Sequence, residues 1–188
     1  MNVTRFLQRL AQREFAGEAL FAAIVAQARR PEFYREHLVP DTLDGRFDMI
    51  ALHMFLVLRR LKLEGPAARP LAAGLVDRLF ADLDRSLREM GAGDLGVGRR
   101  VKTMAKAFYG RIAAYEAALA SPDDGALNDA LARNLYGTVA PLPDVVAAIA
   151  RHVRAEAHSL ACQPLAAFEV GRVAFSAPPA RIGAERAA

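Results

Sequence analysis

Apolar residues recur at spacings of three and four along most of this chain, and no other feature limits its fold as strongly. The broadest stripe is made by Phe47, Ile50, Ala51, Met54, Phe55, Leu58 and Leu61. This spacing places the side chains on one face of an α-helix, and a face this wide is typical of a central helix. The spacing returns in residues 71–87, 101–119, 127–135 and 145–160. We therefore predict an all-α fold, with a single compact domain of about six to eight helices.

Helix-breaking residues separate these stripes. They are Pro31, Gly65-Pro66, Gly91, Ser121-Pro122-Asp123-Asp124, Pro141 and Pro143. Before Pro31 we expect a short amphipathic helix near residues 6–10 and a second helix over residues 20–28. Asp44 is expected to be the N-cap of the broad central helix. Gly91 is expected to end the helix over residues 71–87.

Composition favours one folded, helical domain. Hydrophobic residues make up 53% of the sequence, and Ala and Leu dominate while β-branched residues are sparse. We predict one helical domain over residues 1–176 and a disordered tail over residues 177–188. The best apolar run, Met49 to Leu58, is ten residues long and contains His53, whereas a membrane-spanning helix needs ~18. The one cysteine, Cys162, cannot form an intramolecular disulfide and is expected to be a small buried residue.

A glycine-rich segment, Gly91-Ala92-Gly93-Asp94-Leu95-Gly96, matches the G-x-G-x-x-G pattern of dinucleotide-binding loops. In those loops a strand precedes the turn and a helix follows it, so that the pyrophosphate meets the helix N-terminus. Here a helical stripe precedes the segment. We therefore interpret residues 91–98 as a turn between two antiparallel helices that binds no nucleotide.

A run of cations without any carboxylate lies between Gly98 and Arg111. Its members are Arg99, Arg100, Lys102, Lys106 and Arg111. Arg99, Lys102 and Lys106 share one face of the expected helix. Two interpretations stay open with equal weight. The run is either a solvated helix face or a docking surface for anionic lipid, RNA or an acidic protein surface.

Other polar residues give no pattern typical of a metal or catalytic site. Asp44, Asp48 and His53 lie close together in the sequence, but we expect Asp44 to cap its helix, Asp48 to pair with a cation and His53 to lie at the edge of the core. His152 and His158 are six residues apart, which is not the i,i+4 spacing of a helical zinc site. The sequence also contains no nucleophile-elbow string. We predict no catalytic residue, no metal and no cofactor.

Two long strings give the chain a resemblance to a known family. The first is Phe33-Tyr34, then Val39-Pro40-Asp41-Thr42-Leu43-Asp44-Gly45-Arg46-Phe47-Asp48 and Leu52-His53. The second is Leu87-Arg88-Glu89-Met90-Gly91, Gly93-Asp94-Leu95, Gly98, Val101-Lys102, Met104-Ala105 and Ala107-Phe108-Tyr109-Gly110-Arg111, followed later by Arg133-Asn134-Leu135-Tyr136. Over roughly residues 30–140 the chain resembles the ubiquinol–cytochrome c chaperone family.

The resemblance implies a helical assembly factor that catalyses nothing. Its expected partner is newly made cytochrome b or another subunit of the bc complex, with no small-molecule substrate. The expected location is the cytoplasm, with peripheral contact at the inner face of the membrane, where the cations at 99–111 would meet a partner. The alternative is a helical module that binds RNA or the ribosome through the same cations.

Overall fold

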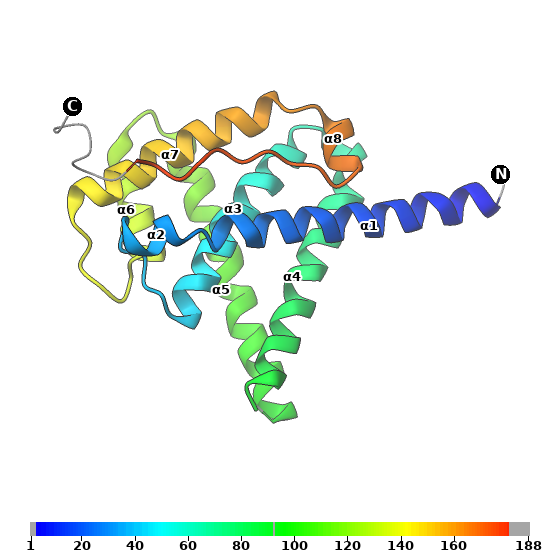
Figure 1. Ribbon diagram of the computed structural model, residues 1–188, viewed down its shortest axis with the longest axis horizontal. Helices are drawn as coiled ribbons and strands as arrows, with labels where there is room; N and C mark the ends of the chain where they lie inside the picture. The colour runs from blue at the N-terminus through cyan, green and yellow to red at the C-terminus, as the bar shows by residue number, and fades with distance from the viewer. Residues whose placement is uncertain (1–2, 92, 181–188) are drawn as a thin grey trace. The chain divides into compact units, whose positions relative to one another are not determined.

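The computed structural model describes residues 3–91 and 93–180, and every regular element among them is helical (Figure 1). The elements are α1 (Val3–Ala28), α2 (Pro31–Arg35), α3 (Leu43–Lys62), the 3₁₀ helix η1 (Gly65–Ala67), α4 (Arg69–Glu89), α5 (Asp94–Ala120), α6 (Asp124–Asn134), α7 (Pro143–Cys162) and α8 (Leu165–Glu169). The prediction of an all-α fold is confirmed. The described residues form eight α-helices, which agrees with the expected number.

The chain divides into two compact units. The first unit contains the segments up to residue 23, 61–110 and 163–173, and the second contains 24–60, 111–162 and the chain from 174 onward. Helices α1, α3 and α5 each contribute residues to both units. That residues 1–176 act as one domain stays a prediction. Of the expected disordered tail, residues 181–188 lie outside the described part of the chain.

The first unit contains a helical hairpin made by α4 and the first half of α5 (Figure 1). Helix α4 buries Leu71, Leu75, Leu79 and Leu87, which follow the predicted spacing. Phe80 meets the fully buried Phe108 of α5 edge-on, with ring centroids 5.8 Å apart. Gly91 ends α4 with φ +84°, a conformation that glycine adopts without strain. The interpretation of this segment as a turn between helices is confirmed, although α5 already begins at Asp94.

A second contact in the first unit joins the turn after α8 to α1. Gly171 has φ +77°, and a Cβ added to it would lie 2.6 Å from the Cβ of Ala19. Glycine is therefore required there by backbone conformation and by space. Helix α1 also contacts α4 in this unit, because Arg78 of α4 pairs with Glu18 of α1 at 3.1 Å.

The second unit has an apolar core, with aliphatic and aromatic side chains, to which α3, α6 and α7 contribute. From α3 the core receives Met49, Leu52, Met54, Phe55, Leu56 and Val57, all at most 2% exposed. Helix α7 buries Val145, Val146, Ile149, Val153 and Leu160, the residues of its predicted stripe. Asp123 caps α6, because its Oδ1 accepts a hydrogen bond of 2.9 Å from the N–H of Gly125.

Three local predictions are wrong. The segment before Pro31 forms the single helix α1, since Gly17 alone costs a helix only ~1 kcal/mol and does not break it. Thr42, not Asp44, caps α3: its Oγ1 accepts from the N–H of Gly45 at 3.1 Å, while Asp44 lies in the first turn. Cys162 is exposed, because it is the last residue of α7.

Candidate functional site

Four cations project from the first half of α5 and form what we call the basic face: Arg99, Arg100, Lys102 and Lys106. All four are exposed, whereas Val101 and Met104 are partly buried and Phe108 is fully buried. The helical spacing thus separates the charged and apolar sides as predicted. Within the described residues, none of the four forms an ion pair with a carboxylate, so the face carries charge of a single sign.

Arg111, the fifth cation of the run, belongs to the second unit and has a different environment. Its Nη2 lies 2.7 Å from Oδ1 of Asp48, and the two side chains are only 19% and 12% exposed. Its guanidinium also lies 5.8 Å from the centre of the Phe47 ring. Burial raises the pKa of the Asp48 carboxyl to about 7, although Arg111 opposes this rise. The prediction that Asp48 pairs with a cation is confirmed, and that cation is Arg111.

Two histidines lie on either side of Phe33 in the second unit. The ring of Phe33 is 5.5 Å from that of His53 and 5.7 Å from that of His152. His53 is 1% exposed, so it lies in the core rather than at its edge, and its Nδ1 donates to the Met49 carbonyl at 2.9 Å. Burial lowers the pKa of His53 to about 4 and that of His152 to about 4, which keeps both rings neutral at pH 7.

The acidic and histidine residues of α3 that lie close together in the sequence are held by contacts within the protein. Asp48 is engaged by Arg111, and His53 is enclosed by core side chains. No group of three or more His, Cys, Asp or Glu residues that could hold a metal ion occurs within residues 3–91 and 93–180 as far as their side chains are described.

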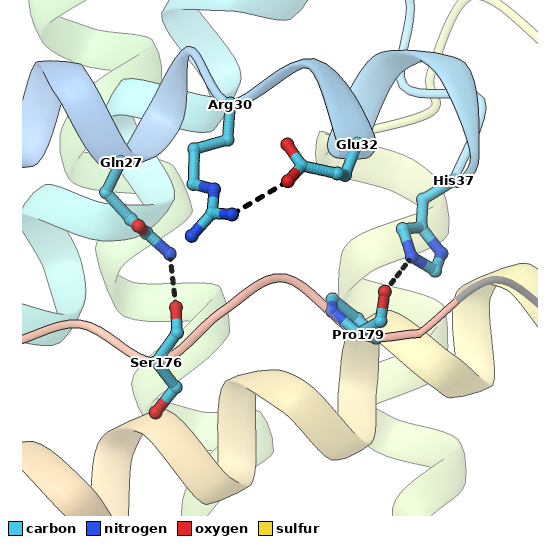
Figure 2. Close-up of polar contacts among 6 residues, drawn as sticks. All are labelled: Gln27, Arg30, Glu32, His37, Ser176 and Pro179. Atoms are coloured by element: carbon cyan, nitrogen blue, oxygen red, sulfur yellow. Dashed lines mark hydrogen bonds and ion pairs between the residues drawn. The ribbon is translucent and has the colours of Figure 1, made fainter.

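The chain after α8 forms an extended segment, residues 174–180, which we call the C-terminal strap. The Ser176 N–H donates to Oε2 of the fully buried Glu156 at 3.0 Å. Figure 2 shows that Gln27 and His37 also point at the strap. Gln27 Nε2 donates to the Ser176 carbonyl at 2.8 Å, and His37 Nε2 donates to the Pro179 carbonyl at 3.0 Å.

These contacts share one property, which is that side chains of the helical body bind main-chain atoms of the strap. Residues 177–180 were expected to belong to a disordered tail. One of them, Pro179, is bound through its carbonyl by His37. His37 is itself fixed, because its carbonyl accepts from the Tyr136 hydroxyl at 2.8 Å. Sequence reasoning missed the strap because contacts to backbone atoms leave no residue pattern.

None of the helices in the described part of the chain is long and apolar enough to cross a membrane. In the described residues, the fold and these surfaces define a class: an all-α protein with an exposed basic face on α5.

Comparison with known proteins identifies the family. The family described as ubiquinol-cytochrome C chaperone matches residues 35–175, three quarters of the sequence. The crystal structure of the Cbp3 homolog from Brucella abortus is 37% identical, covers 94% of this chain and 97% of that chain, and has a TM-score of 0.83. The chain belongs to the ubiquinol-cytochrome C chaperone family. The resemblance found in the two strings is confirmed, and the match extends beyond residue 140.

Curated relatives carry a related name. Ubiquinol-cytochrome-c reductase complex assembly factor 1 of Xenopus laevis is 26% identical over 147 residues, which cover 78% of this chain and 73% of the relative. The Homo sapiens protein of that name is 25% identical over 141 residues, covering 75% of this chain and 47% of the relative. The matched region thus spans about half the length of the human relative and of the Mus musculus relative.

Proposed function

We propose that this chain is a non-enzymatic chaperone for the assembly of ubiquinol–cytochrome c reductase and that it binds newly made cytochrome b at the membrane surface. The observation that carries the proposal is the family match over residues 35–175, together with the 37% identical bacterial structure. The names of the curated relatives support the same process. A chaperone of this kind needs surfaces for binding and no reacting group.

We assign partner docking to the basic face. Arg99, Lys102 and Lys106 are exposed cations of one helix side, and like charges at this spacing repel each other slightly, so they do not help folding. Removing them should change the free energy of unfolding by no more than about 0.5 kcal/mol. An anionic surface on the partner or on the membrane would gain from all of them, and the gain would fall as salt increases.

The first experiment asks whether the client is cytochrome b. The tagged protein is purified from solubilised membranes, and co-purifying cytochrome b is detected by immunoblot and by its haem absorbance. Deleting the gene should also lower the level of assembled bc complex on native gels. If deletion lowers the complex but no cytochrome b is captured, the client is another subunit. If deletion leaves the complex unchanged, the assembly function is wrong.

The second experiment tests the basic face. The variant carries Arg99→Glu, Lys102→Glu and Lys106→Glu, and the matched control carries Arg69→Glu, Arg85→Glu and Arg172→Glu. The control cations are exposed residues of the same unit, so the net charge changes equally. Both proteins should keep the melting temperature of the wild type. Only the basic-face variant should lose assembled complex, and normal assembly with a folded variant would refute docking through this face.

RNA is the alternative partner of the basic face, and its single-sign charge is the observation that favours it. Binding of a mixed RNA oligonucleotide would fall steeply with salt and would be lost in the basic-face variant. Preference for RNA over anionic vesicles at equal ionic strength would favour the ribosome-binding interpretation. The reverse preference would favour the membrane surface.

A further inference from the structure

A cavity of about 410 Å³ opens in the second unit where α1 ends and α2 begins. Its walls are Arg29, Pro31, Tyr34, Arg35, Asp41 and Arg46. The cavity lies within the 300–1,000 Å³ range that is usual for small-ligand sites. Tyr34, Asp41 and Arg46 come from the first of the two strings that carry the family resemblance, and none of them has a role in the surfaces described above.

Positive charge predominates in this cavity. Three of its six residues carry a guanidinium and one carries a carboxylate. Arg46 Nε lies 2.6 Å from Asp41 Oδ1, and this hydrogen bond holds the pKa of the Asp41 carboxyl below its usual value. The charge of Asp41 is thus matched by Arg46. Arg29 and Arg35 are exposed, and neither forms an ion pair with a carboxylate in the described part of the chain, so two positive charges are left unbalanced.

The cavity is also held in shape by the backbone around it. Gly45 packs so closely against the Pro40 carbonyl that any Cβ would overlap this oxygen, and the N–H of Gly45 donates to Thr42 Oγ1 at 3.1 Å. These contacts fix the loop that carries Asp41 and the start of α3 that carries Arg46. On the other wall, the Tyr34 hydroxyl donates to the Ala28 carbonyl at 2.8 Å, which fixes the ring.

The chemistry of this cavity selects its ligand. Guanidinium groups bind phosphate oxygens through paired N–H donors, and several guanidiniums together suit a doubly charged phosphate. The cavity has about 410 Å³ of space, more than ten times the ~30 Å³ that one water molecule occupies. A phosphate group is only a few times larger than a water molecule, so it would fill a small part of this space. The flat Pro31 and Tyr34 walls suit an organic substituent. We propose that this cavity binds an organic phosphate ester, with Arg29, Arg35 and Arg46 on the phosphate.

Two sources share this chemistry, a soluble phosphate ester and the headgroup of an anionic phospholipid. The probes are therefore sn-glycerol 3-phosphate in calorimetric titration, and vesicles of phosphatidylglycerol or phosphatidylcholine in flotation. The full chain is compared with Arg29→Ala/Arg35→Ala. The matched control is Arg69→Ala/Arg85→Ala, which removes two exposed cations from the first unit. All four replaced side chains are exposed, and far-UV circular dichroism with the melting temperature verifies that each variant is folded.

The expected result is saturable binding of glycerol 3-phosphate that weakens roughly tenfold or more in the cavity variant and less than about twofold in the control. If the source is lipid, the wild type also floats with phosphatidylglycerol and not with phosphatidylcholine, and the cavity variant floats less. If the source is soluble, vesicle binding is equal in the cavity variant and the wild type. Absence of glycerol 3-phosphate binding, or binding that the cavity variant retains, overturns the proposal. Neither outcome bears on assembly of the bc complex, so the proposed function is tested separately.

Discussion

Arg111→Met removes the cation from its pair with Asp48 while keeping much of the side-chain volume. The guanidinium and carboxylate are 2.7 Å apart, and neither side chain is more than 19% exposed. Breaking a buried ion pair by removing one member costs about 3–5 kcal/mol when the other charge is left uncompensated. Asp48 can avoid that state by taking up a proton, because burial raises the pKa of its carboxyl to about 7. The cost should therefore depend on pH.

The sign of this dependence follows from the pKa of Asp48. It is about 7 in the folded chain against 3.8 for a free carboxyl, so the group supports the fold fully below pH 3.8 and loses this support as the pH rises through 7. In the wild type the loss ends above about pH 7. In Arg111→Met the pKa rises further, and the loss continues at up to 1.4 kcal/mol per pH unit, roughly. We expect a cost of about 1–2 kcal/mol at pH 6, from the lost ion-pair contact and packing, and about 3 kcal/mol at pH 8.

Urea unfolding followed by far-UV circular dichroism measures this cost between pH 6 and pH 9. Arg100→Met is the matched control, since Arg100 is an exposed cation of the same helix and should change the free energy of unfolding by no more than about 0.5 kcal/mol. Asp48→Asn removes the titrating group, so its cost should show the opposite trend and be roughly 1 kcal/mol smaller at pH 8 than at pH 6. A cost of Arg111→Met that is equal at all pH values, or largest in acid, would refute the link to Asp48. A stability equal to that of the wild type would return Arg111 to the candidate docking residues.

Three further predictions concern the two units separately. Gly171→Ala should destabilise the protein by about 2–4 kcal/mol in thermal melting, because its φ is +77° and the new methyl group would overlap α1, whereas Gly74→Ala has open space and should not destabilise. Phe108→Asp should abolish the helical circular dichroism signal, because it places a charge in a fully buried position, and an unchanged melting temperature would mean that this face is exposed. Burial lowers the pKa values of His53 and His152 to about 4, so the unfolded chain takes up protons first as the pH falls. The free energy of unfolding of the wild type should therefore fall between about pH 6.5 and 4, by up to about 3 kcal/mol per histidine relative to His53→Gln/His152→Gln. An equal loss of stability in acid in that double variant would contradict this.

The long helices could be predicted because helical order is local. Each hydrogen bond of a helix joins residues four apart, so the spacing of apolar residues in a short window contains the needed information. The helices that were missed, α2 and α8, have five residues each, too few for a spacing to repeat. The cap of α3 was missed for a related reason: Thr42 and Asp44 are both good caps, and their order along the chain does not decide between them.

The candidate sites were predictable only where they depend on one helix. The exposure of Arg99, Lys102 and Lys106 follows from the helical face that they share. Arg111 was grouped with them because its partner Asp48 lies on α3, and no spacing relates two helices. The strap is held by Gln27, His37 and Glu156, which bind main-chain atoms far away in the sequence. Contacts to main-chain atoms depend little on which side chains the strap carries, so the sequence of the strap does not predict them.

The string from Val39 to Asp48 shows how stability and binding can be separated within one motif. Gly45 is required because no Cβ fits beside the Pro40 carbonyl, and Asp48 is required by its buried pair with Arg111, so packing accounts for both. Arg46 differs, since it and Asp41 form an ion pair whose side chains are more than half exposed. Exposed pairs of this kind contribute little to stability, so the fold gains little from a guanidinium there. Stability therefore does not explain Arg46, whereas the phosphate ligand that we propose for the adjoining cavity would.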